Sequence, residues 1–378
     1  LTAGAGVDQD AEIDSTQKTA KSDGRSPAAI MVTTLSDELA IHTAGNAKIF
    51  GVSIKDRGAV TMAGHAGKAF WFSKASGEFV TSNYYYNSYP AWVTEWNEGK
   101  MAASYSGKTW NLLHNQDTYL FGDEDDRPWE TDLAGFGRTF PHPYGTDDGK
   151  YFTTLLTLSP AGDELTLAFT KALITNEELG TDEIPDYLGV SFSSTDYVGH
   201  IFGPSSLESE DNILQLDRTL AALFAFIDKN IGLSNTLIVL SADHGTPEVP
   251  GYLNELGILA GYVEPKNWDK QPALAALKNQ FGIDKELIVG YDHPYVYEII
   301  KEYNLDLRQV EQAVAKELLQ FEGIAQAISS SALREASLPD TPLNQAILNN
   351  FNPSRSGDIY LVFEPHWFIR DFDGLEVA

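Results

Sequence analysis

Two stretches of sequence, YLGVSFSSTDYVGH at positions 187–200 and TLIVLSADHG at positions 236–245, decide the predicted fold. Each begins with a short run of strand-forming apolar residues, 187–193 in the first and 236–241 in the second. Between the two runs, apolar residues recur at the three-and-four spacing of an amphipathic helix from position 211 to the glycine at 232. We therefore predict a right-handed strand–helix–strand crossover, in which the two strands are parallel.

Four potential metal ligands follow the two predicted strands: Asp196 and His200 after the first, and Asp243 and His244 after the second. The carboxyl ends of parallel strands lie at the same edge of an open α/β sheet, so the two pairs are expected to converge. Zinc accepts carboxylate oxygen and imidazole nitrogen. Asp196 and His200 can face one ion from a single helical turn, whereas the adjacent Asp243 and His244 suit a second ion or a bridging arrangement.

A purely structural interpretation of the same residues stays open at this point. An Asp-His-Gly sequence after a strand can supply a helix cap, a buried histidine and a turn glycine. An aspartate and a histidine four positions apart on a helix can simply be part of its surface. The occurrence of both pairs at one edge of a single crossover favours the metal centre.

Several motifs along the chain carry a resemblance to a known family. They are TDYVGH at 195–200, SADHG at 241–245, IKDRGA at 54–59 with AGH at 63–65, FPHP at 140–143, and RSGDIY at 355–360. Through them the chain resembles the alkaline phosphatase superfamily, and within it the phosphate-irrepressible, periplasmic, monomeric type with a threonine nucleophile. The resemblance implies an α/β fold with a mostly parallel, alkaline-phosphatase-like sheet flanked by helices and two inserted subdomains.

The resemblance also implies an activity, the hydrolysis of phosphate monoesters to inorganic phosphate through a covalent phosphoenzyme and two zinc ions. Asp196 and His200 resemble ligands of one zinc, and Asp243 and His244 resemble ligands of the other. Each site is then one ligand short, because the remaining ligands and the threonine of the family match positions before Leu1 or after Ala378. We therefore expect a central fragment of a longer enzyme, with little phosphatase activity and weak metal affinity when it is isolated.

Lys55 and Arg57 follow a predicted strand over residues 47–54. Side chains two apart on an extended segment point the same way, and a lysine with an arginine can hold several phosphate oxygens. From the residues alone, a solvated surface pair balanced by Asp56 is the alternative. The resemblance implies phosphate binding instead, and such a pair favours monoesters, which expose more charged oxygens than diesters. A phosphodiesterase or nucleotide pyrophosphatase of the same superfamily, and a non-catalytic binder of metal or phosphate, are the competing hypotheses.

Other polar residues are expected to have structural roles. Thr34 is predicted to cap a helix over residues 37–43, and Ser194 and Thr195 are expected to support the neighbouring Asp196 rather than to attack the substrate. His366 follows a predicted strand at 358–363 and is expected to be packed or on the surface. Structural roles are also the default expectation for the remaining histidines, His42, His65, His114, His142 and His293. His65 is set apart from the others because it follows the Lys-x-Arg pair.

Composition narrows the class of protein further. The 378 residues contain no cysteine and 43% hydrophobic residues, so the fold depends on its apolar core without disulfides. A net charge of −28 argues against nucleic acid or an anionic membrane as a partner, and no stretch approaches a membrane span. The expected partners are small phosphate monoesters, and the resemblance implies a periplasmic or secreted protein.

The chain is predicted to form one catalytic domain over residues 1–378 with two insertions, after a loop-like start at 1–26. The first insertion, 69–139, is rich in aromatic residues, which we expect to pack together, and it has a hairpin turn at Ser76-Gly77. The second, 247–350, has predicted helices at 272–280 and 307–319 and strands at 286–289, 295–300 and 323–329. Residues 358–363 are then expected to return to the main sheet.

Overall fold

The computed structural model describes residues 25–298, 303 and 305–370, and most of the predicted loop at 1–26 lies outside them. The chain divides into two compact units, one up to Thr246 and one from Pro247 onward. Among the described residues, no helix is both long enough and apolar enough to cross a membrane.

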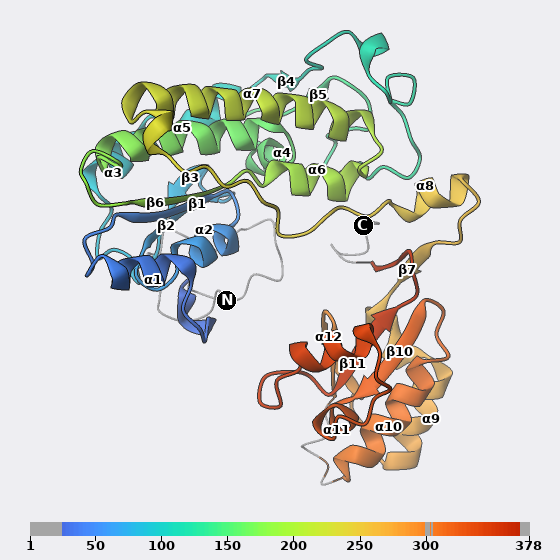
Figure 1. Ribbon diagram of the computed structural model, residues 1–378. Helices are drawn as coiled ribbons and strands as arrows, with labels where there is room; N and C mark the ends of the chain where they lie inside the picture. The colour runs from blue at the N-terminus through green and yellow to red at the C-terminus, as the bar shows by residue number, and fades with distance from the viewer. Residues whose placement is uncertain (1–24, 299–302, 304, 371–378) are drawn as a thin grey trace. The chain divides into compact units, whose positions relative to one another are not determined.

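A four-stranded sheet in the order β3-β2-β1-β6 forms the centre of the first unit (Figure 1). β1 (Ile49–Ser53) is parallel to β6 (Tyr187–Ser191) on one side and to β2 (Lys68–Ser73) on the other. β2 and β3 (Glu78–Val80) form an antiparallel hairpin, whose turn contains Gly77 at a φ of 75°. This positive φ is accessible to glycine without strain, and the predicted hairpin turn is confirmed.

Helices cover both faces of this sheet (Figure 1). α2 (Asp56–Ala63) packs on one face and α5 (Pro160–Asn176) on the other, and α6 (Ser194–Phe202) and α7 (Leu207–Asn230) pack on the α5 side. A Cβ atom at Gly51 of β1 would lie 2.2 Å from a backbone oxygen of α2, so a glycine is required where the helix crosses the strand. The predicted α/β class, with a mostly parallel sheet flanked by helices, is confirmed.

The first unit contains further short elements outside the sheet. α1 (Leu35–His42) begins at a capping box formed by Thr34, which confirms the predicted cap. The others are η1 (Pro27–Ala29), α3 (Ala91–Glu98), η2 (Met101–Tyr105), η3 (Gln116–Thr118), α4 (Phe152–Thr157), η4 (Leu233–Asn235), and the antiparallel pair β4 (Thr109–Trp110) and β5 (His142–Pro143).

Residues 236–241, predicted as the second strand of the crossover, do not form a strand. Their apolar side chains are exposed instead of buried, with Leu237 90% and Leu240 82% accessible. A strand requires a neighbour to accept and donate its backbone hydrogen bonds, and no strand in the described part of the chain pairs with this segment. β6 is therefore at the edge of the sheet, and the predicted parallel crossover is wrong in its second strand.

Aromatic packing in the first unit involves the sheet itself. Phe70 lies on β2 and Phe79 on β3, so the aromatic-rich segment predicted as an insertion begins within the main sheet. Phe79 stacks on Phe169 of α5 with the ring centroids 4.2 Å apart, and Trp96 meets the same Phe169 ring edge-on. These aromatic residues form a packed core between sheet and helix, which is the role expected for them.

The second unit has its own antiparallel sheet in the order β10-β11-β9-β8. Its strands are β8 (Ile288–Asp292), β9 (Tyr295–Glu298), β10 (Ile324–Ser329) and β11 (Ile359–Phe363). The expectation that residues 358–363 return to the main sheet is wrong, because β11 pairs with β10 and β9 here.

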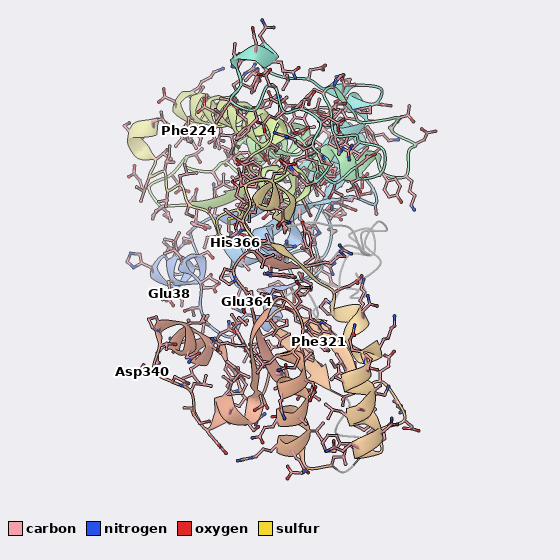
Figure 2. The ribbon with its side chains drawn as sticks, turned by 90° about the vertical axis from the view of Figure 1, so that its right-hand side faces the viewer. Glu38, Phe224, Phe321, Asp340, Glu364 and His366 are labelled. Atoms are coloured by element: carbon pink, nitrogen blue, oxygen red, sulfur yellow. The ribbon has the colours of Figure 1, made fainter. Side chains whose placement is uncertain are left out.

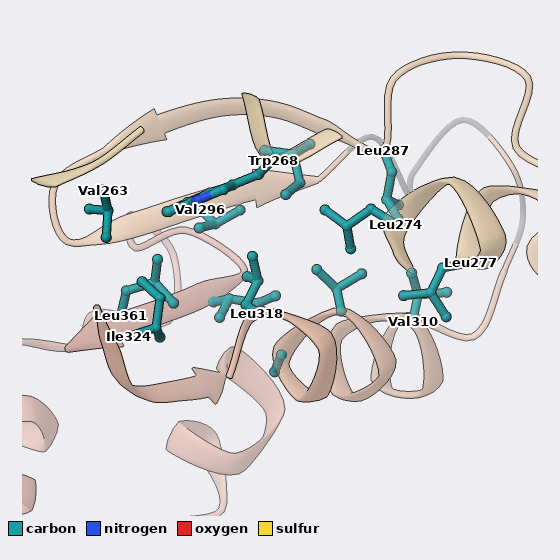
Figure 3. Packing of buried hydrophobic residues seen from close by; sticks show 14 of the residues in the cluster. Val263, Trp268, Leu274, Leu277, Leu287, Val296, Val310, Leu318, Ile324 and Leu361 are labelled. Atoms are coloured by element: carbon teal, nitrogen blue, oxygen red, sulfur yellow. The ribbon is translucent and has the colours of Figure 1, made fainter. Parts of the chain in front are cut away.

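Helices α9 (Pro272–Phe281) and α10 (Leu307–Leu318), both close to their predicted bounds, contribute leucine and valine side chains to the core of this unit (Figure 3). The remaining elements are α8 (Pro250–Glu255), η5 (Pro265–Lys270), α11 (Ser330–Arg334), α12 (Pro342–Asn350), and the parallel pair β7 (Gly261–Val263) and β12 (Trp367–Ile369).

A buried polar group in the first unit consists of His142, Glu208 and Glu130. His142 Nε2 lies 3.0 Å from a carboxyl oxygen of Glu208, and both side chains are fully buried. Burial lowers the pKa of His142 to about 4 and raises the pKa values of Glu130 and Glu208. Repulsion by Glu208 raises the pKa of Glu130 further. His142 is thus a structural histidine, as expected from the sequence.

Replacing Glu130 with glutamine is expected to stabilise the protein at alkaline pH. Because the pKa of Glu130 is higher in the folded than in the unfolded chain, its contribution to the free energy of unfolding is present at low pH and is lost as pH rises. The variant should therefore gain about 1.4 kcal/mol over wild type for each pH unit in which only the folded chain keeps the proton. Urea unfolding between about pH 5 and pH 9, with the exposed Glu183→Gln as control, measures this; parallel stability curves would refute it.

Candidate functional site

The candidate site lies where β1 and β6 end side by side. Ser53 and Ser191, the last residues of the two strands, are register partners. α2 begins after Lys55, and α6 carries Asp196 in its first turn. The Lys55 ammonium contacts the Asp196 carboxylate in an ion pair whose side chains are only 9% and 18% exposed. The ends of two parallel strands thus bring together charges 141 positions apart in the sequence.

Two histidines approach the same carboxylate. His200 lies one helical turn after Asp196 on α6, and its Nε2 is 3.4 Å from Asp196 Oδ1. His244 comes from the exposed segment that follows residues 236–241, and its Nε2 is 3.3 Å from the same oxygen. The two imidazole rings have centroids 6.5 Å apart. Asp196 is therefore the centre of a group made of one lysine and two histidines.

Asp243 is at the margin of this group. Its side chain is 84% exposed, and Oδ2 lies 3.6 Å from His244 Nε2. The four predicted ligands thus lie near one another, with His244 in contact with both aspartates. In the part of the chain that the structure describes, no three His, Asp or Glu side chains are arranged around a common point as metal ligands would be. They contact one another and Lys55 instead.

The pKa of Asp196 is determined by its burial and by these charged neighbours. Burial opposes its ionisation, but the hydrogen bond with His200 and the positive charge of Lys55 outweigh that effect and hold the pKa of Asp196 well below its usual range. The carboxylate is consequently ionised throughout the physiological pH range. It offers a permanent negative charge to a cation at the site.

Lys55 and Arg57 are arranged differently from the prediction. The segment after β1 is not extended, because α2 starts at Asp56 and places Arg57 in its first turn. Lys55 points toward Asp196, whereas Arg57 is exposed. The argument that side chains two apart share a direction does not hold across a strand–helix junction.

Tyr197 and Lys74 were not identified from the sequence. Lys55 Nζ lies 4.4 Å from the centroid of the Tyr197 ring, and Lys74 Nζ lies 4.6 Å from it. Lys74 also donates a hydrogen bond of 3.3 Å to the Tyr197 hydroxyl. Tyr197 could have been identified from its position inside the TDYVGH motif. Lys74, which directly follows β2, belongs to none of the motifs identified in the sequence.

The other polar residues considered from the sequence lie around this site or away from it. Thr195 accepts a hydrogen bond of 2.9 Å from Asn212, which is the supporting arrangement expected of it. His65 pairs with Asp37 at 2.8 Å, and this contact raises the pKa of His65. His366 is exposed in the turn between β11 and β12 of the second unit (Figure 2).

Comparison with known proteins matches this chain to one family model and to several curated proteins. The model of the family described as type I phosphodiesterase / nucleotide pyrophosphatase matches residues 61–376. Alkaline phosphatase PhoV of Synechococcus elongatus is 35% identical over 346 residues, which are 91% of this chain and 62% of that protein. Alkaline phosphatase PafA of Elizabethkingia meningoseptica is 36% identical over 344 residues, or 89% of this chain and 62% of that protein.

A third curated relative is named a calcium-transporting ATPase and comes from Myroides odoratus; it is 35% identical over 93% of this chain and 65% of its own length. The crystal structure of wild-type PafA superposes with a TM-score of 0.85 at 33% identity, covering 96% of this chain and 69% of that one. The chain spans less than two thirds of the length of the curated relatives it matches.

Proposed function

The chain belongs to the type I phosphodiesterase / nucleotide pyrophosphatase family of the alkaline phosphatase superfamily, and from this premise we propose that it carries the phosphate- and metal-binding centre of a metal-dependent phosphomonoesterase. One observation carries the proposal: Lys55, His200 and His244 converge on the Asp196 carboxylate at the carboxyl ends of adjacent parallel strands. A carboxylate, two imidazoles and an ammonium at this edge suit both a cation and a phosphoryl group.

The types of side chain present fit a divalent metal. Carboxylate oxygen and imidazole nitrogen are donors that zinc accepts, and both imidazoles lie within 3.4 Å of Asp196 Oδ1. We propose Asp196 and His200 for one zinc ion, and Asp243 and His244 for a second. A bound ion would supply Lewis-acid stabilisation of the charge on the phosphoryl oxygens. Protons compete with a metal ion for imidazole nitrogen, so metal binding should weaken in acid.

Lys55 and Arg57 would bind the phosphate. Lys55 is held by Asp196 and by the Tyr197 ring, so its ammonium is placed before the substrate arrives, which lowers the cost of ordering it. Arg57, exposed in the first turn of α2, is free to reach outward with a planar fork that matches two phosphate oxygens. The net charge of −28 repels phosphate esters at a distance. These two cations supply the positive charge that attracts the phosphate at the site itself.

This pair of cations favours monoesters over diesters, because the monoester exposes one more charged oxygen. We propose small-molecule phosphate monoesters as substrates, and phosphate scavenging by a monomeric protein in the periplasm or outside the cell as the setting. The description of the matched family supports a phosphodiesterase as the second candidate.

The decisive experiment assays the complete translation product that contains these 378 residues. We expect hydrolysis of p-nitrophenyl phosphate to exceed that of bis-p-nitrophenyl phosphate in kcat/KM, to stop on chelation by EDTA, and to return with Zn²⁺. Elemental analysis of the purified protein identifies the resident metal. A higher kcat/KM for the diester would support the phosphodiesterase, and phosphate binding without turnover would refute both enzymes in favour of a binding protein.

A further inference from the structure

The three residues immediately before Asp196 are each held by a different element of the fold. Ser193 and Ser194 open α6, and Thr195 and Asp196 follow in its first turn. Their partners are Ser53 of β1, 3.1 Å from the Ser193 hydroxyl; Asp163 of α5, which accepts a 3.1 Å hydrogen bond from the Ser194 backbone N–H; and Asn212 of α7, which donates a 2.9 Å hydrogen bond to the Thr195 hydroxyl. Ser53, Asp163 and Asn212 are termed the α6 anchors.

The anchors are buried and therefore have little freedom to move. Ser53, Asp163 and Asn212 are at most 1% exposed. A buried polar group that loses its partner is destabilising, so each of these hydrogen bonds resists displacement of α6. The Ser53 hydroxyl also accepts a hydrogen bond of 2.9 Å from the Lys55 backbone N–H. Ser53 thus connects the end of β1 to Lys55 and, through Ser193, to the start of α6, which carries Asp196.

Among the α6 anchors, Asp163 has the strongest physical reasons to hold the start of α6 in place. Its carboxylate accepts from a first-turn N–H of α6, where the positive end of the helix dipole favours an anion. The close approach of α5 and α6 depends on Gly162, at which a Cβ atom would lie 2.5 Å from the Ser194 hydroxyl oxygen. Burial raises the pKa of Asp163 to about 7, although the Ser194 hydrogen bond opposes this shift.

We infer that the α6 anchors, and Asp163 above all, are positioning residues that fix the Asp196 carboxylate relative to Lys55, His200 and His244. The inference rests on the proposed function of that site. Asp163 acts only through the backbone of α6, two residues before Asp196, where the helix advances by about 1.5 Å per residue. Displacement of reacting groups by about 1 Å can cost a hundredfold in rate, so loss of this hydrogen bond should affect catalysis beyond its effect on stability.

The test compares Asp163→Ala with Asp163→Asn in the complete translation product. The asparagine retains an oxygen that accepts from the Ser194 N–H, whereas alanine does not. We expect Asp163→Ala to lower kcat for p-nitrophenyl phosphate by about 10- to 100-fold with KM changed by less than about threefold. Asp163→Asn should recover kcat to within about threefold of wild type, because the positioning hydrogen bond is kept.

A second readout does not depend on turnover. Zn²⁺ affinity, measured by competition with a chromophoric chelator, should fall by about tenfold in Asp163→Ala and remain near wild type in Asp163→Asn. If the wild-type protein hydrolyses neither ester, the proposed function fails, while the Zn²⁺ affinities still test the positioning role. If turnover occurs but the variants do not differ from wild type, the positioning role fails alone.

Glu311 provides a matched control in the second unit. It is a buried carboxylate on α10 that accepts a 3.0 Å hydrogen bond from the Ser331 N–H in the first turn of α11. Glu311→Ala removes the same kind of contact, so it should lower the unfolding temperature but leave kcat and Zn²⁺ affinity of the folded protein unchanged. A purely structural role for Asp163 would give the same pattern.

A folded Asp163→Ala protein with kcat and Zn²⁺ affinity within about twofold of wild type would overturn the inference. Should this variant fail to fold, Asn212→Ala removes the anchor of Thr195 and is the alternative. It should lower both quantities by at least about threefold, and unchanged values would overturn the inference equally.

Discussion

Replacement of Asp196 with asparagine is expected to lower kcat/KM for a phosphate monoester by about 10³-fold or more. The carboxylate is the common partner of Lys55, His200 and His244, so removal of its charge affects the phosphate-binding lysine and both imidazoles at once. Asparagine has the same shape, which isolates the loss of charge from the loss of packing. Steady-state kinetics together with the zinc content of the purified variant measure the effect.

The control for this prediction lies at the amino end of β6, the strand whose carboxyl end leads to Asp196. Asp186 precedes β6 and accepts backbone hydrogen bonds from Lys48 and Gly180 at 2.7 and 2.8 Å. Asp186→Asn changes an aspartate at the amino end of the strand whose carboxyl end leads to Asp196, and should retain turnover within about threefold of wild type. Retention of turnover and zinc by Asp196→Asn at the level of this control would contradict the proposed centre.

Replacement of Lys55 with methionine is expected to reduce kcat/KM for a monoester by about 10²-fold and for a diester by less. Methionine keeps an unbranched apolar stem near the Tyr197 ring but removes the ammonium, which is 4.4 Å from the ring centroid and in contact with Asp196. The monoester loses more because it presents the additional charged oxygen that the lysine would meet. The ratio of the two kcat/KM values is the quantity to compare.

Lys48→Met tests the same substitution at the other end of β1. The Lys48 ammonium donates to the backbone oxygen of Glu178 and is exposed, so this variant should keep the monoester-to-diester ratio of wild type. An equal loss for both esters in Lys55→Met would show that the lysine supports the structure of the site rather than recognition of the substrate. It would also remove the main argument for monoesters.

The sequence by itself determined the elements whose signals are local. The apolar spacing of α7 and α10, the capping box at Thr34 and the hairpin turn at Gly77 each depend on residues within a few positions of one another. The i,i+4 placement of Asp196 and His200 is equally local, because one turn of helix is enough to bring them together. Such features form from nearest neighbours and were predicted correctly.

The tertiary structure alone decided which strands have partners and where charged side chains meet. Residues 236–241 have the apolar composition of a strand, and 358–363 form one, but composition does not say which neighbour supplies the backbone hydrogen bonds. The approach of His244 to Asp196 and the anchoring of α6 by Asp163 join segments far apart in the chain. These contacts depend on how sheet and helices pack in three dimensions, because a residue's own neighbours in sequence carry no information about a partner brought near only by folding.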